Sequence, residues 1–192
     1  VEAVSRGLPR EALDVVAGFY GFDGGSPEGS SRWIPAAYSN TTNTIVINKA
    51  DIEESVTNEE ARKDLLFSVT HESYHALDAA KNFTREMLGM RINLSRVDGE
   101  IKMDLDSLTG EMYNAYVADN ELGKVFKYPF NSIAHYLANS VDGNLDLAAQ
   151  MVRQELFAQA GAVFTNNPKL LKKFAPETYK MMQEIQADPR SL

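Results

Sequence analysis

The segment His71-Glu72-Ser73-Tyr74-His75 constrains this chain more than any other stretch. Residues four apart lie one above the other on the same face of an α-helix. Two imidazoles at this spacing can bind one zinc ion and leave positions for a third ligand and a water. Glu72 lies beside the first histidine and can accept a proton from that water. The pattern predicts a helix that carries part of a metal site; the alternative is a helix with two partly buried histidines and no metal.

The composition limits which ligands and partners are possible. The chain has 192 residues, no cysteine and a net charge of −8. Without thiolates, a metal must be held by histidine, carboxylate and water. An acidic chain with no long basic run is a poor partner for nucleic acid or an anionic membrane surface, and no apolar run approaches the roughly 18 residues of a membrane span. We therefore expect neither nucleic acid nor membrane as a partner.

Length and apolar content predict one domain over residues 1–192, since 44% of the residues are apolar. We expect lobes at about 1–82 and 83–192 with a cleft between them, and a monomer. The absence of cysteine fits a secreted bacterial protein. The chain starts at Val1 and shows no signal peptide, so we expect a mature form or a domain of something longer.

The first 82 residues predict a small sheet followed by the metal-site helix. Residues 1–20 have the spacing of a short amphipathic helix, and 21–32 form a loop that is either a solvated connection or a flap. Residues 33–38 and 44–48 predict two strands joined by a turn. If Thr44, Ile45, Val46 and Ile47 form an edge strand, they could bind an extended peptide substrate by strand addition; an ordinary core strand is the alternative.

Thr57 and Glu60 have the spacing of a capping box, which predicts that the metal-site helix starts near 58 and continues to about Asn82. Beyond it, Asp98-Gly99 indicates either a hairpin or a broken helix. From about 131 onward the chain predicts helices, beginning with one near 131 and continuing with 144–165, 169–174 and 176–187. The predicted fold class is α+β, with a small N-terminal sheet and a mainly helical C-terminal lobe.

The helix predicted at 144–165 supplies a candidate third ligand. Glu155 and Gln159 fall on its apolar stripe, where a carboxylate is costly unless it has a charge partner. A zinc ion is such a partner, and Gln159 could steady the carboxylate. The alternatives are a surface carboxylate at the edge of the stripe and a satisfied core amide. Glu111 is the next candidate ligand, and His135, beside apolar neighbours, favours a structural role.

A family resemblance follows from three short blocks. Residues 71–78 are H-E-S-Y-H-A-L-D, residues 155–160 are E-L-F-A-Q-A, and residues 174–179 are F-A-P-E-T-Y. Together these resemble the zinc-protease domain of anthrax lethal factor and its relatives, which include secreted bacterial Pro-Pro endopeptidases. The match covers about 71–78 and 152–182.

This resemblance implies a zincin-like fold of the gluzincin type. It implies that His71, His75 and Glu155 bind one zinc ion per chain and that Glu72 is the general base. It also places Asp78 behind a ligand histidine, although by spacing Asp78 could equally be a surface residue. The long interval between His75 and Glu155 indicates an insertion around 90–130.

The family also has a catalytic tyrosine about two turns before the glutamate ligand, where this chain has Ala148. Tyr136 lies further upstream and could reach the site if the intervening loop folds back. Tyr113, Tyr116 and Tyr128 are competing candidates.

The function expected from these features is that of a zinc endopeptidase acting on a protein or peptide. It would be a secreted bacterial protease, or the catalytic domain of a toxin or effector that is delivered into a target cell. The main alternative is a catalytically inactive zincin-fold binding module. A metal hydrolase acting on a non-peptide bond is a third possibility for which the sequence carries no specific signal.

Overall fold

The computed structural model describes residues 14–23, 36–82, 84, 90–125, 130–140 and 142–187. Within these ranges the protein combines helices with two small sheets, as the α+β prediction requires. The elements are β1 (Gly18–Phe22), β2 (Ala36–Ser39), β3 (Thr44–Asn48), α3 (Lys49–Thr57), α4 (Glu59–Lys81), β4 (Ile92–Val97), β5 (Glu100–Leu105), α5 (Ser107–Val117), α6 (Glu121–Val125), α7 (Phe130–Ser140), α8 (Leu145–Asn166), α9 (Pro168–Phe174) and α10 (Pro176–Ala187). No helix in the described ranges combines the length and the hydropathy that membrane crossing demands.

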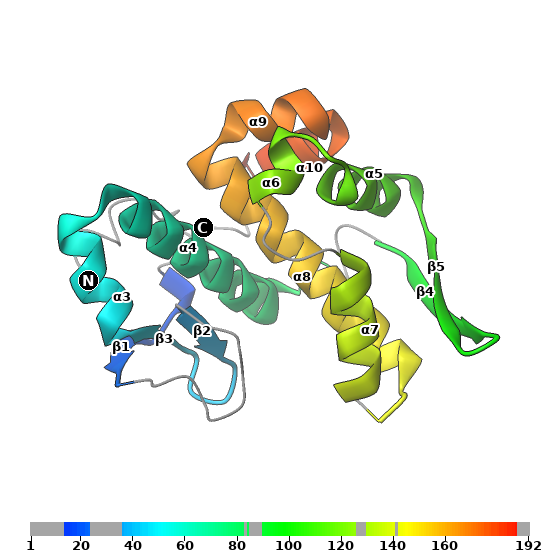
Figure 1. Ribbon diagram of the computed structural model, residues 1–192, viewed down its shortest axis with the longest axis horizontal. Coiled ribbons are helices and arrows are strands. Elements are labelled where there is room, and N and C mark those ends of the chain that lie inside the picture. Colours follow the sequence, from blue (N-terminus) through cyan, green and yellow to red (C-terminus); the bar gives the residue numbers. More distant parts are fainter. Residues whose placement is uncertain are drawn as a thin grey trace.

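Helix α4 lies between the three-stranded sheet and helix α8 (Figure 1). Its first half buries Leu65 and Val69 together with Ile45 of the sheet. Further along, Tyr74 and Leu77 enter a second hydrophobic core to which α8 contributes most heavily. The helix therefore has two apolar faces that point in different directions, and it links two cores that would otherwise be separate.

Both ends of α4 are closed by asparagine. The side chain of Asn58 accepts hydrogen bonds from the backbone N–H groups of Glu60 and Ala61, at 3.0 and 3.2 Å. Asn82 adopts the left-handed conformation, with a φ of 55°, and ends the helix. The predicted bounds are confirmed, but the predicted cap is wrong, because Thr57 is the last residue of α3 and Asn58 takes the capping position.

The three-stranded sheet has the order β1-β3-β2, with β1 parallel and β2 antiparallel to β3. The strand β1, Gly18–Phe22, contradicts the predicted helix at residues 18–20 and the predicted loop at residues 21–22. Residues 1–13 and 24–35 lie outside the described ranges. Phe19 is the register partner of Ile45. This pairing joins segments distant in sequence, so local apolar spacing could not distinguish a strand from a helix here.

The central position of β3 corrects the predicted substrate strand. Residues Thr44–Ile47 do form a strand, but β1 and β2 pair with its two edges. Strand addition needs an unpaired edge, so a peptide cannot add at 44–47. Among the described residues, β2 is paired on one side only, and its packing against α4 brings the free edge near the metal-site helix.

The second sheet is the hairpin β4–β5, which projects beside α7 and α8 (Figure 1). Asp98 and Gly99 have φ values of 53° and 83°, as a type I′ turn requires at both central positions. The hairpin prediction is confirmed, and the alternative of a broken helix is wrong.

The helical prediction beyond residue 131 is confirmed by α7, α8, α9 and α10. Asn167 closes two of these helices, because it follows the last residue of α8 and its side chain accepts from the N–H of Leu170 at the start of α9. Helices α3, α5 and α6 were not predicted. Helix α5 begins after Asp106, whose carboxylate accepts from the N–H of Thr109.

The crossing of α4 and α8 depends on a glycine. A Cβ placed on Gly161 would lie 2.3–2.4 Å from ring atoms of Tyr74. The Tyr74 ring also packs edge-on against Phe157, with the centroids 5.7 Å apart, and its hydroxyl lies 3.1 Å from the hydroxyl of Thr165. The tyrosine thus occupies space that only glycine leaves free.

We predict that Gly161→Ala destabilises the protein. Alanine favours a helix over glycine by about 1 kcal/mol, but displacing a packed ring costs about 1–3 kcal/mol, so we expect the free energy of unfolding to fall by up to about 2 kcal/mol. Gly110→Ala in α5 is the control, because its added Cβ would meet only Leu105, at 4.0 Å. Urea unfolding should show the control at least as stable as the parent. Equal stability of the two variants would contradict the proposed crowding.

Candidate metal centre

The predicted ligands come together where α4 and α8 face each other. His71 and His75 lie one turn apart on α4, and Glu155 lies on α8. The Nε2 atoms of the two histidines are 3.1 Å apart. Glu155 places Oε2 3.2 Å from the Nε2 of His71 and Oε1 3.3 Å from the Nε2 of His75. Donor atoms from helices far apart in sequence thus converge on one point.

These separations fit a tetrahedral zinc ion. Ligand atoms about 2.0–2.1 Å from a tetrahedral centre are separated from one another by about 3.3–3.4 Å. The separation of 3.1 Å between the two Nε2 atoms is close to that value, and each Nε2 lies 3.2–3.3 Å from a different oxygen of Glu155. One ligand atom from each of the three residues lies within 4.8 Å of the others. The two imidazole rings meet nearly edge to face, with an interplanar angle of 79°, so their Nε2 atoms can converge without stacking of the rings. The donor set therefore fits zinc in both chemistry and spacing.

The site has an open side. In the described part of the chain, the potential ligand group consists of His71, His75 and Glu155, with no fourth member. The side chains of these residues are 14%, 17% and 31% exposed. Structural zinc sites are closed by four protein ligands, whereas catalytic sites keep a position for water or substrate. Three partly exposed ligands match the catalytic arrangement.

The charges of the site favour a bound cation. Burial raises the pKa of Glu155, but the neighbouring His71 and His75 more than offset this and hold that pKa well below its usual range. Burial lowers the pKa of His75, but the carboxylates of Glu155, Glu72 and Asp78 outweigh it and the net pKa is raised. Glu155 is therefore ionised at neutral pH, and a metal at His75 would compete with a proton for the ring nitrogen.

Glu72 connects the site to the sheet. Its Oε2 atom accepts a hydrogen bond of 2.8 Å from the backbone N–H of Tyr38 on β2. A sequence argument could not predict this contact, because the donor is a backbone group and carries no side-chain signature. The hydroxyl of Tyr38 points elsewhere and donates to Asn43.

Asp78 is hydrogen-bonded to the turn that follows α4. Its two carboxylate oxygens accept from the backbone N–H and the hydroxyl of Thr84, at 2.7 and 2.9 Å. Within the described ranges no hydrogen bond joins Asp78 to a ligand histidine. The alternative of a surface residue is wrong, because Asp78 is only 3% exposed. The aspartate fixes the turn after α4 and acts on His75 through its charge.

The structure places Gln159 near the site but does not identify the catalytic tyrosine. Gln159 is partly buried one turn beyond Glu155, but no hydrogen bond between them is found in the described structure. The backbone of Tyr136 lies in α7, while its side chain and that of Tyr116 lie outside the described part, as does all of Tyr128. Tyr113 packs against the larger core. The identity of the catalytic tyrosine therefore stays a prediction.

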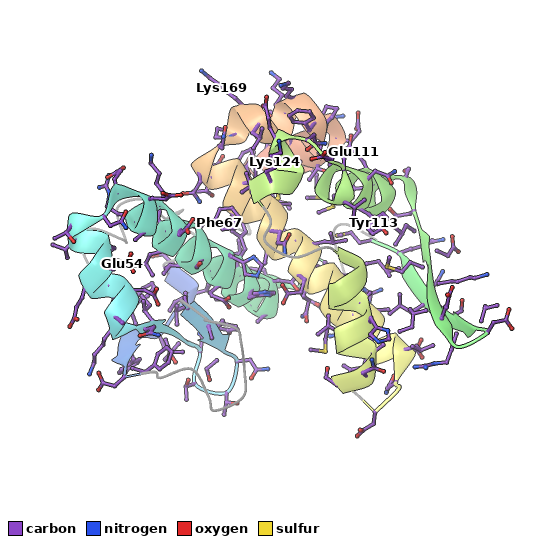
Figure 2. The ribbon with its side chains drawn as sticks, viewed as in Figure 1. Glu54, Phe67, Glu111, Tyr113, Lys124 and Lys169 are labelled. Carbon is purple, nitrogen blue, oxygen red and sulfur yellow. The ribbon has the colours of Figure 1, made fainter. Side chains whose placement is uncertain are left out.

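Glu111, the alternative ligand, lies on α5 next to α10 (Figure 2). Its carboxylate accepts from the N–H groups of Glu177 and Thr178 and from the hydroxyl of Thr178. It thus caps α10 and is wrong as a ligand. His135 is exposed on α7 near the β4–β5 turn, and it does not belong to the ligand group.

Comparison of this chain with protein-family models, with curated proteins and with solved structures finds no match. The geometry of the site and the local sequence resemblance are therefore the two supports for any function.

We predict that Glu155→Gln loses zinc. Changes in residues that merely support a metal ligand weaken binding by about 10–100-fold, so loss of a charged ligand should weaken it at least that much. Glu111→Gln is the matched control, since Glu111 caps a helix outside the site. Metal analysis after dialysis should find about one zinc per chain in the parent and the control. Undiminished zinc in Glu155→Gln would refute the ligand set.

Proposed function

We propose that this protein is a zinc-dependent endopeptidase of the gluzincin type with a zincin-like fold. The observation that carries the proposal is the cluster of donor atoms from His71, His75 and Glu155, a donor set that suits zinc. The two Nε2 atoms lie 3.1 Å apart, and each lies 3.2–3.3 Å from a different oxygen of Glu155. Glu72 adjoins the first histidine on the same helix, as a general base in such a site requires.

The arrangement of elements supports the same proposal. A mixed sheet packs on one side of α4, and α8 brings a glutamate to its other side. This arrangement is compatible with the zincin-like fold that the resemblance implies. The open side of the site and the presence of Glu72 favour catalysis over a purely structural metal.

The residues can be assigned roles in peptide hydrolysis. Bound zinc would supply a Lewis acid that acidifies a water and polarises the scissile carbonyl. His71, His75 and Glu155 would hold the ion. Glu72 would take the proton from the attacking water and deliver it to the leaving amine. Tyr136 is the proposed donor to the developing oxyanion.

The proposed substrate is a protein or peptide bound in extended form. Because β3 is paired on both sides, the proposed binding edge is that of β2, which lies near Glu72 and is paired on one side only among the described residues. Backbone pairing along β2 would use the outward-facing groups of this edge other than the Tyr38 N–H, which already donates to Glu72. Such pairing would position the scissile bond without demanding a particular side chain.

We predict that Glu72→Ala keeps zinc but loses cleavage. Removing a general base costs typically about 10²–10⁴-fold in rate, while the three ligands remain in place. The zinc-loaded parent and variant should be compared by digesting a peptide library and identifying the products by mass spectrometry. His71→Ala serves as a second comparison, because it should lose zinc and cleavage together. Full activity in zinc-loaded Glu72→Ala would sink the assignment of the base.

A further inference from the structure

The hydrogen bond between Tyr38 and Glu72 joins two parts of the proposed active site. The donor is a backbone N–H on strand β2, and the acceptor is the Oε2 atom of the proposed base on α4. The bond length of 2.8 Å is typical of a charge-assisted hydrogen bond to a carboxylate. Strand β2 thus contacts the proposed general base, Glu72, directly.

The direction of this N–H follows from the register of the sheet. Strand β2 pairs antiparallel with β3, and Tyr38 is opposite Ile45. In an antiparallel pair, successive residues alternate between bonding to the partner strand and pointing away from it. The N–H of Tyr38 points away from β3, since it donates to Glu72. Its hydrogen bond to Glu72 therefore takes no hydrogen bond away from the pairing of β2 with β3.

The other oxygen of Glu72 remains available. In the described structure, Oε1 has no hydrogen-bond partner, and it is not among the buried atoms that lack one. A carboxylate held by one oxygen cannot rotate freely, so its second oxygen keeps a fixed direction. That is the geometry a general base needs toward the water that it deprotonates.

We infer that the backbone N–H of Tyr38 is a positioning group for Glu72, holding Oε2 so that Oε1 faces the reacting water. This inference rests on the proposed peptidase function for its catalytic consequence, but the hydrogen bond itself does not depend on it. Tyr38 acts through Glu72 and is a positioning residue. Any side chain at position 38 keeps this donor except proline, which has no N–H.

Amide hydrogen exchange tests the hydrogen bond directly. In the zinc-loaded protein, the N–H of residue 38 should exchange about tenfold to a hundredfold more slowly than in zinc-loaded Glu72→Ala. The amides of β3 serve as internal controls, since that strand is paired on both sides. Equal exchange of the residue 38 amide in the two proteins would overturn the inference, whether or not any peptide is cleaved.

The catalytic role is tested with a pair of variants at position 38. Both Tyr38→Pro and Tyr38→Ala remove the phenol ring, but only the proline variant removes the N–H. Proline is tolerated where an edge strand points its N–H outward. We expect kcat of Tyr38→Pro to be about tenfold to a hundredfold below that of Tyr38→Ala, with similar KM and zinc content.

The possible outcomes separate this inference from the proposed function. Equal kcat values for the two variants, with zinc retained, would overturn the positioning role. A parent protein that cleaves no peptide in the library would contradict the proposed function, and the exchange comparison would still decide whether Tyr38 holds Glu72. If Tyr38→Pro fails to fold, slower exchange in the parent than in Glu72→Ala still supports the inference, because that comparison needs no substitution at position 38.

Discussion

Helix α4 must bury apolar residues in two directions, and the rest of the structure is arranged around this requirement. Its first half packs on the sheet, and its second half packs on α8. The close approach of Tyr74 to Gly161 sets how near the two helices lie. The same approach fixes the distance at which Glu155 faces the two histidines. The spacing of the metal ligands is therefore a product of core packing, which is more rigid than a loop could provide.

Much of the fold could be predicted because its elements carry local signals. The β4–β5 hairpin has a turn that demands positive φ at Asp98 and Gly99, and α8 has a long apolar stripe. Helix α3 gave no signal because none of its residues is buried, so it has no apolar face to recognise. Strand β1 was mistaken for helix because its partner, β3, lies far along the chain. The spacing of apolar residues indicates which face of a single helix or strand is buried. It does not indicate which strands pair, because pairing depends on contacts between distant parts of the chain.

In the candidate site, too, the residues could be predicted from the sequence, but their hydrogen-bond partners could not. His71, Glu72 and His75 follow from spacing within one helix, and Glu155 follows from a charge on an apolar stripe. Hydrogen-bond partners do not follow in this way. Asp78 bonds to Thr84, and Glu72 bonds to a backbone group of β2. Both contacts depend on how the chain turns after one element and where another strand lies, and neither leaves a pattern in residue type.

The parallel pairing of β1 with β3 determines which residues a shorter fragment of the protein must keep. Strand β3 is the run T-I-V-I-N, in which every residue but Val46 is buried. Without β1, one side of this β-branched strand would offer free N–H and C=O groups to any neighbouring chain. Residues Gly18–Phe22 therefore shield the sheet against self-association, although no ligand of the metal site comes from them. A minimal fragment built around the two histidines would have to retain this N-terminal strand to stay dispersed in solution.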